Sequence, residues 1–222
     1  MHADGTREIE LDLAVALEEF LDAGGRLPLP PYVHTDSEEN QQDYQTVFAV
    51  NPGSVAAPTA ALHFTTETFA ALEKRGIQTC VLTLQIGLGT FLPMRSESID
   101  AHRMHAESFE ISADTARTIA DAKASGRRIV AVGTTVTRAL EAAAEENGMP
   151  RAGVAQTELF ITPGFRFRVI DAMLTNFHLP RSTLLVLVSA FAGRERVMRA
   201  YEEAVRRRYR FFSFGDVMLL EH

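Results

Sequence analysis

The sequence predicts an α/β fold in which helices flank a largely parallel or mixed sheet, with residues 1–219 forming a single domain. Short apolar segments alternate along the chain with amphipathic segments that end in glycine, and this alternation is typical of α/β domains. One segment, 129–132, is wholly apolar, as expected of a strand covered on both faces. The length of 222 residues suits one domain with a sizeable core.

The first fifty residues predict a helix, an irregular connection and a strand. Apolar residues recur at helical spacing over 13–21, and Gly24-Gly25 follows as a stop, so we expect a helix that covers a face of the core. Segment 27–32 is rich in proline, which excludes it from a sheet interior and predicts an extended connection. The alternation of apolar and polar residues in segment 44–50 predicts a strand.

The next elements are a helix and a strand that contains the single cysteine. A helix is expected from about residue 66 to residue 75, because Gly76 then offers the left-handed conformation that ends helices. The strand predicted at 78–84 includes Cys80, which is therefore expected to be a buried, unreactive thiol. A lone cysteine also excludes an internal disulfide and fits a reducing compartment.

The middle of the chain predicts two helices around the apolar strand. Ser112 caps a helix that Gly126 closes, and the strand 129–132 follows. The Gly-Thr-Thr turn 133–135 then leads into a helix that is expected to end near Asn147. A strand followed by such a turn and a helix resembles a ligand-binding turn at the carboxyl edge of a sheet, although the lysine of a nucleotide-binding Walker loop is missing.

The last third of the chain predicts further strands and two helices. Strands are expected at 157–161, at 166–170 and, closing the sheet, at 210–214. Helices are expected after Ser182 and after Gly193. Residues 220–222 resemble the start of a purification tag, so they are expected to be a tag remnant outside the domain.

A polar turn lies between two segments that read as buried. Asn176 and His178 precede Pro180, and the apolar run that begins at Leu184 follows. Buried polar groups cost free energy unless they are paired, so their concentration here indicates a site. The alternative is a well-capped loop whose histidine only satisfies a carbonyl group.

Further segments, the first of them rich in small residues, carry a resemblance to a known family. They lie at 53–65, 86–91, 132–135 and 209–216, in addition to the polar turn. In this order the segments resemble the S-adenosylmethionine:tRNA ribosyltransferase-isomerases of queuosine biosynthesis, from about residue 25 to residue 219. Family members are usually longer, with an N-terminal portion that contains an inserted β-barrel, so the chain resembles the C-terminal part of their large domain.

The resemblance implies both a reaction and its site residues. The family moves and isomerises the ribosyl group of S-adenosylmethionine onto 7-aminomethyl-7-deazaguanine in tRNA, which gives epoxyqueuosine and releases adenine and methionine. S-adenosylmethionine is then a substrate, and no cofactor is expected. His63 and His178 are the candidates for proton transfer, because imidazole titrates near neutrality. The candidate substrate-binding residues are Thr59, Phe64, Thr65, Gly87, Gly89, Thr90, Phe91, Gly133, Thr134, Thr135, Asn176, Phe177 and Asp216.

These segments make two further expectations. We expect four loops to converge at one edge of the sheet: 53–65, 87–90, 133–135 and 176–178. The two histidines should then face one pocket, and a methionine carboxylate could accept from the backbone N–H groups of the Gly-Thr-Thr turn. No metal is expected, because no cysteine or further carboxylate completes a ligand set with His102, His105 and Glu107. Glu107 is instead a candidate for orienting a histidine.

Some residues depart from the family pattern. Gln85 stands where the family has a histidine, and an amide does not exchange a proton near neutral pH. Ala61, Val136 and Thr162 replace a glycine, a serine and a tyrosine of the pattern. Two alternatives therefore stay open: a diverged transferase that uses S-adenosylmethionine on another acceptor, and a truncated binding domain without catalysis.

Charge and hydropathy bear on partners. The chain has 22 basic and 29 acidic residues, yet residues 151–222 hold eleven arginines against seven acidic residues. This basic end is a candidate tRNA contact, with a solvated helix face as the alternative. No signal peptide or membrane span is predicted, and a cytoplasmic location is expected. The sequence does not indicate an oligomeric state.

Overall fold

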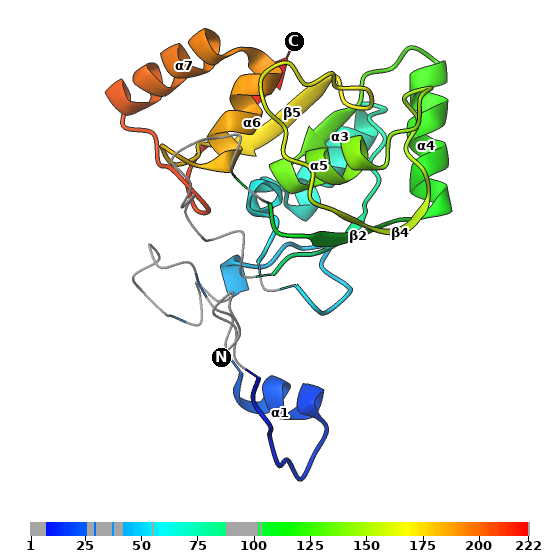
Figure 1. The fold of residues 1–222 in the computed structure, drawn as a ribbon, viewed down its shortest axis with the longest axis vertical. Coiled ribbons are helices and arrows are strands. Elements are labelled where there is room, and N and C mark those ends of the chain that lie inside the picture. The colour runs from blue at the N-terminus through cyan, green and yellow to red at the C-terminus, as the bar shows by residue number, and fades with distance from the viewer. Residues whose placement is uncertain are drawn as a thin grey trace.

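The structure is a computed structural model that describes residues 8–25, 29, 37, 42–54, 56–87, 102 and 104–221. It confirms the predicted α/β class, with helices packed around strands (Figure 1). The strands, however, form two three-stranded sheets instead of one. The first sheet is antiparallel in the order β1-β2-β4, formed by Thr83–Gln85, Glu107–Ile111 and Gly153–Thr157.

The second sheet is mixed and has the order β3-β5-β6. Strand β5 (Ala172–Asn176) lies in the middle, parallel to β3 (Val130–Val132) and antiparallel to β6 (Val217–Glu221). Strand β3 is at the edge, and Val130 is 48% exposed. The prediction that this segment is covered on both faces is therefore wrong, since only Ala131 of the strand is fully buried.

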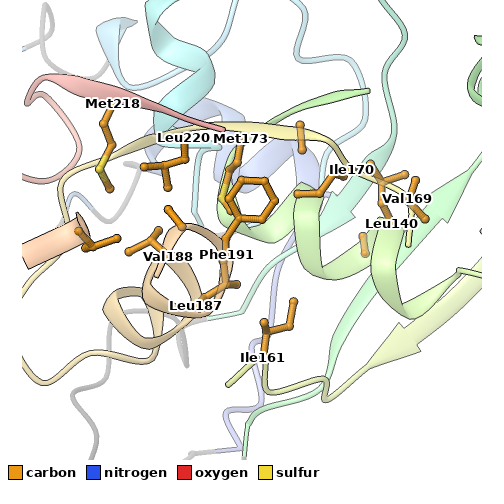
Figure 2. Packing of buried hydrophobic residues seen from close by; sticks show 14 of the residues in the cluster. Leu140, Ile161, Val169, Ile170, Met173, Leu187, Val188, Phe191, Met218 and Leu220 are labelled. Carbon is orange, nitrogen blue, oxygen red and sulfur yellow. The ribbon is translucent and has the colours of Figure 1, made fainter. Parts of the chain in front are cut away.

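The hydrophobic core lies where helices pack on this second sheet. Figure 2 shows Leu187, Val188 and Phe191 beside Met173 of the central strand and Leu220 of β6. The first three belong to α6 (Thr183–Ala192), which also packs against α7 (Arg194–Arg206). Burying a side chain of this size stabilises the fold by about 1.5–3 kcal/mol, so this cluster holds the second sheet and its helices together.

The helix boundaries follow the predicted capping residues. Helix α3 (Thr66–Lys74) begins after Thr65, whose hydroxyl accepts the Thr68 N–H at 3.2 Å, and helix α4 (Ala113–Ala124) begins after Ser112 in the same way. Gly76 and Gly126 end them with φ angles of 69° and 67°, in the left-handed region. Ser182 likewise caps α6. Helix α5 (Thr134–Ala142) stops before the predicted end at Asn147.

Several predicted strands are wrong because other acceptors take their backbone N–H groups. In the segment predicted as 166–170, the N–H groups of Arg168, Val169 and Ile170 donate to the carboxylate of Glu141 on α5. The segment 210–214 forms a turn, in which the Phe212 N–H donates to a carbonyl outside any strand. The sheet positions are taken by residues 153–157, 172–176 and 217–221 instead.

Two strand predictions in the first half also differ from the structure. Residues 44–50 form a turn in which Tyr44 is buried while Val47 and Val50 are exposed, so the alternation there does not reflect a sheet. Only the end of the predicted strand 78–84 pairs, as β1. Cys80 therefore lies outside the sheet and is exposed, which corrects its predicted burial, although neighbouring atoms desolvate the thiol and raise its pKa.

The N-terminal helix does not cover the core as predicted. Helix α1 (Leu17–Gly24) lies apart from the rest of the fold in Figure 1. Its Leu17, Phe20 and Leu21 are about half exposed, at 47%, 47% and 51%. The proline-rich segment 27–32 lies outside the described residues except for Leu29.

At the other end of the chain, Leu220 and Glu221 belong to β6. Leu220 pairs with Met173 and is 8% exposed, so it is part of the core. Whether residues 220–222 derive from a tag stays a prediction, as does the single domain over 1–219. Among the described residues, no helix is long and apolar enough to cross a membrane.

Candidate functional site

The candidate site lies at the carboxyl edge of the parallel strands β3 and β5. Parallel neighbours end at the same edge, and the loops that follow them meet there. The Gly133 N–H donates to the Leu174 carbonyl at 2.8 Å, which continues the pairing just past the end of β3. Helix α5 begins immediately afterwards, at Thr134. The sequence folds this way because Gly133, with φ of 101°, permits the abrupt turn from strand to helix.

The small-residue segment reaches this edge through a short helix. Its 3-10 helix η1 (Thr59–His63) contacts β5, and the Thr59 hydroxyl donates to Asn176 Oδ1 at 3.0 Å. Ser54, earlier in the same segment, accepts the Ile86 N–H at 3.1 Å. The segment therefore touches both the polar turn after β5 and the loop that begins at Gly87.

The loop at 87–90 is described only at its start. Gly87 follows Ile86, whose N–H donates to Ser54, whereas Gly89, Thr90 and Phe91 lie outside the described residues. Gln85, the residue that departs from the family pattern, has its amide beside Gly53: a Cβ on that glycine would lie 3.6 Å from Gln85 Nε2. The departure is thus located next to the candidate site.

The segment 209–216 closes the site from another side. His63 Nε2 lies 3.0 Å from the Gly215 carbonyl, and the Phe212 N–H donates to the Phe177 carbonyl at 3.0 Å. Asp216 accepts the Arg210 N–H at 2.7 Å, so its carboxylate stabilises its own turn. The predicted convergence is therefore seen for segments 53–65, 133–135 and 176–178, and segment 209–216 joins them. Loop 87–90 lies outside the described residues except for Gly87, so its place at this edge stays a prediction.

His178 is buried and belongs to a small polar network. Its Nε2 lies 3.1 Å from the Thr175 hydroxyl, and its backbone N–H donates to the Tyr201 hydroxyl at 2.8 Å. Burial lowers the pKa of the imidazole to about 4, and burial also raises the pKa of Tyr201 to about 12. The imidazole of His178 is therefore neutral at physiological pH.

His63 occupies a different environment. It is exposed and lines an open cavity of about 490 Å³ together with Phe64, Thr65, Arg210 and Phe214. His178 is not among the residues that line this cavity. The predicted pocket shared by the two histidines is therefore not found in the part of the chain that the structure describes. The reason is that His178 turns toward Thr175 in the interior.

Phe177 lies inside an aromatic cluster and does not face the cavity. Its ring packs against Tyr201, Tyr209 and Phe211 at centroid distances of 5.3, 5.8 and 5.3 Å, and the residue is 4% exposed. Phe177 was expected to contact the substrate, but its ring instead packs against other aromatic rings in the interior. Phe64 is less buried and its ring packs on Phe69 at 5.7 Å, so it keeps an edge toward the cavity.

Residues of the histidine pattern at 102–107 form an ion pair and a ring contact. Glu107 Oε2 accepts a hydrogen bond from Arg138 Nη1 at 2.5 Å, and both side chains are buried. This pair joins β2 to α5. The His102 ring packs edge-on against Phe160, while His105 is exposed. Within the described ranges, no group of three His, Cys, Asp or Glu residues is placed to hold a metal ion.

Sequence reasoning missed three residues that support this site. Thr175 and Tyr201 hold His178, and Gly215 supplies the carbonyl that His63 contacts. The spacing of Thr175, three residues before His178, was a usable signal. Nothing in the sequence indicated Tyr201, because its approach depends on how α7 packs.

Known proteins are similar to this chain over nearly its whole length. Residues 1–220 match the queuosine biosynthesis protein family. The S-adenosylmethionine:tRNA ribosyltransferase-isomerase of Pelotomaculum thermopropionicum is 52% identical over 218 residues, which are 98% of this chain and 64% of that protein. The protein of the same name from Ralstonia nicotianae is 56% identical over 203 residues, or 91% of this chain and 57% of the relative.

A solved structure shares the fold. The crystal structure of S-adenosylmethionine tRNA ribosyltransferase from Thermotoga maritima is 46% identical, with a TM-score of 0.60, and the alignment covers 72% of this chain and 50% of that one. The chain therefore spans about three fifths of the length of the curated relatives that it matches, between 57% and 64%.

Proposed function

The chain belongs to the queuosine biosynthesis protein family, and on this premise we propose that it carries the S-adenosylmethionine site of a tRNA ribosyltransferase-isomerase. In the proposed reaction, the ribosyl group of S-adenosylmethionine moves to 7-aminomethyl-7-deazaguanine in tRNA and is isomerised. The products are epoxyqueuosine in the tRNA, adenine and methionine. S-adenosylmethionine is consumed as a substrate, so the reaction needs no cofactor.

The observation that carries this proposal is the meeting of four segments, 53–65, 133–135, 176–178 and 209–216, at one sheet edge. Hydrogen bonds from Thr59 to Asn176 and from Gly133 to Leu174 connect two of these segments to β5. The contact of His63 with Gly215 connects a third. Ligand sites of α/β folds form at such an edge, where loops from separate strands supply polar groups.

The two histidines take different parts in this proposal. The reaction needs a base near the 5′ carbon, whose protons are acidified by the sulfonium, and a proton for the departing adenine. His63 lines an open cavity and is the candidate for this proton transfer. His178, which stays neutral and bonded to Thr175, acts as a positioning residue for the end of β5.

The tRNA partner is expected on the basic surface around the C-terminal end of α7. Arg206 and Arg207 both pair with Glu203, which reduces their attraction for phosphate. Arg208 and Arg210 follow directly, and Arg210 lines the cavity that holds His63. An RNA phosphate bound there would lie near the proposed site of proton transfer. We expect a cytoplasmic location as part of the same proposal, because the proposed substrate is a tRNA.

The test is the release of adenine. The chain is incubated with S-adenosylmethionine and tRNA that carries the precursor base, and free adenine is measured by chromatography. His63→Ala should reduce release at least about a hundredfold, as expected for a general acid or base. The matched control, His105→Ala, removes an exposed imidazole elsewhere and should leave release unchanged. Equal rates for both variants would contradict the role of His63.

One observation favours a second function. Gln85 lies beside Gly53 at the site, in a position where the family pattern has a histidine. A diverged transferase that uses S-adenosylmethionine on another acceptor would show adenine release only with that acceptor. Gln85→His separates the two readings: a gain of release with precursor-bearing tRNA supports divergence from the family reaction, and no gain supports the first proposal.

A further inference from the structure

The side chain of Asn176 is buried with half of its hydrogen-bonding capacity unused. Asn176 is 3% exposed, and its Oδ1 accepts the Thr59 hydroxyl at 3.0 Å. Its Nδ2 has no hydrogen-bond partner in the part of the chain that the structure describes. Leaving such a buried donor unpaired costs free energy, so a fold that retains it at a ligand edge indicates a ligand acceptor.

The start of α5 holds a second set of donors at the same edge. Its N-cap is Gly133, which has no side chain to accept from the first turn. Within the described residues, the N–H groups of Thr134 and Thr135 have no acceptor, whereas Thr137 donates to the Gly133 carbonyl with both its N–H and its hydroxyl. Thr134 is 7% exposed, so this helix start is buried and uncapped. Such a helix start attracts anions, because its N–H groups and the helix dipole both favour negative charge.

The strand register brings the two sets together. Val132 pairs with Leu174, and the hydrogen bond from Gly133 to the Leu174 carbonyl extends this parallel ladder. Helix α5 begins at Thr134, directly after this last pair, and it contacts β5, which ends at Asn176. The unpaired amide of Asn176 and the first turn of α5 therefore both belong to the carboxyl ends of neighbouring strands.

We propose that these donors form a carboxylate seat, in which the amide of Asn176 and the first-turn N–H groups of Thr134 and Thr135 hold the α-carboxylate of S-adenosylmethionine. This inference rests on the proposed function for the identity of the ligand. A carboxylate has two oxygens that can accept from two separate donor sets. Asn176 and Thr134 are buried and Thr135 is half-buried, so the charge is held where little water competes for it.

A phosphate group offers the same acceptor chemistry and could come from the tRNA. The seat is assigned to the carboxylate because Thr59 closes the Asn176 side and the neighbouring Thr134 is buried, which suits a small planar group. Inorganic phosphate is therefore included as a separate probe.

The experiment measures binding to the chain by calorimetry with four probes: S-adenosylmethionine, its decarboxylated analogue, L-methionine and inorganic phosphate. Wild type should bind S-adenosylmethionine at least about tenfold more tightly than the decarboxylated analogue, the effect of one charge-assisted hydrogen bond. Asn176→Asp replaces the amide donor by a carboxylate of the same shape. It should weaken the binding of S-adenosylmethionine at least tenfold and abolish the preference over the decarboxylated analogue.

The matched control is Asn147→Asp. Asn147 accepts the Met149 N–H through Oδ1, and a carboxylate keeps that bond. This variant should bind all four probes as wild type does. Circular dichroism melting of both variants checks that Asn176→Asp is folded, and Asn176→Ser, which removes the amide without adding charge, should show an intermediate loss.

The outcomes separate this inference from the proposed function. If S-adenosylmethionine and its decarboxylated analogue bind wild type equally, the seat is wrong and the function stands. If only phosphate binds at this seat, with loss in Asn176→Asp, the ligand is an RNA phosphate and the carboxylate assignment is overturned. Binding of L-methionine without S-adenosylmethionine would retain the seat and contradict the function. Tighter binding by Asn176→Asp would show that the amide presents its oxygen to the ligand and would overturn the proposal.

Discussion

Replacing Glu141 by glutamine tests how the chain positions the strand at the centre of the site. Glu141 is 6% exposed, and its two carboxylate oxygens accept three backbone N–H groups of residues 168–170 at 2.8, 3.0 and 3.0 Å. These residues lead directly into β5. The carboxylate therefore joins α5 to the approach of the central strand, and α5 and β5 meet at the proposed ligand edge.

The structure also sets the magnitude of the effect. Oε1 accepts from Val169 and Ile170, and Oε2 accepts from Arg168 alone. Glutamine can keep the first pair through its oxygen, but its NH₂ group then faces the Arg168 N–H. One charge-assisted bond is lost and a donor is left unpaired, which costs about 1.5–3 kcal/mol. For a chain of this size, that lowers Tm by about 3–12 °C.

Urea unfolding followed by circular dichroism measures this loss. The control is Glu146→Gln, which makes the same chemical change at an exposed position and should stay within about 0.5 kcal/mol of wild type. If the unfolding free energy of Glu141→Gln also stays within about 0.5 kcal/mol of the wild-type value, the reasoning is refuted, because the three hydrogen bonds then do not stabilise the approach to β5.

The remaining predictions concern one arginine, one histidine and the cysteine. Arg208 has a φ of 60°, a left-handed conformation in which glycine is favoured at the end of a helix. Arg208→Gly should therefore raise stability by about 0.5–1 kcal/mol and weaken tRNA binding in a filter assay. As a control, Arg207→Gly removes the same charge from a residue whose φ is −86°, and it should lower stability. Because burial lowers the pKa of His178 to about 4 from 6.5, the unfolded chain binds a proton that the folded chain does not. Stability should therefore fall by about 3 kcal/mol as the pH drops from 6.5 to 4, and His178→Gln should lack this fall in urea titrations. Cys80 is exposed and should react fully with a maleimide in the native protein, whereas a protected thiol would contradict its placement.

The sequence predicted the helices better than the strands, and the reason is local. Ser112, Ser182 and Gly126 act through hydrogen bonds and backbone angles within a few residues of themselves, so their effect can be read from the chain. Strand pairing depends on distant partners. Residues 166–170 have the composition of a strand, but a carboxylate on α5 takes their N–H groups.

The polar residues of β5 explain another difference. The sequence predicted a polar turn at Asn176 and His178, whereas Asn176 is the last residue of the central strand. Thr175 and Asn176 are tolerated there since His178 and Thr59 contact them. The motifs did predict that these segments meet, but not that His178 would turn inward, which depends on the packing of Tyr201 on α7.

The location of S-adenosylmethionine on the chain tests the central claim most directly. In a ¹H–¹⁵N correlation spectrum recorded during titration with S-adenosylmethionine, we expect the largest shifts at the Asn176 side-chain amide, at the N–H groups of Thr134 and Thr135, and within residues 59–63. The structure has another cavity of about 590 Å³, lined by Glu141, Glu158 and Arg166 among others, away from this edge. Shifts confined to the residues of that second cavity, with the carboxyl edge of β3 and β5 unchanged, would contradict the account.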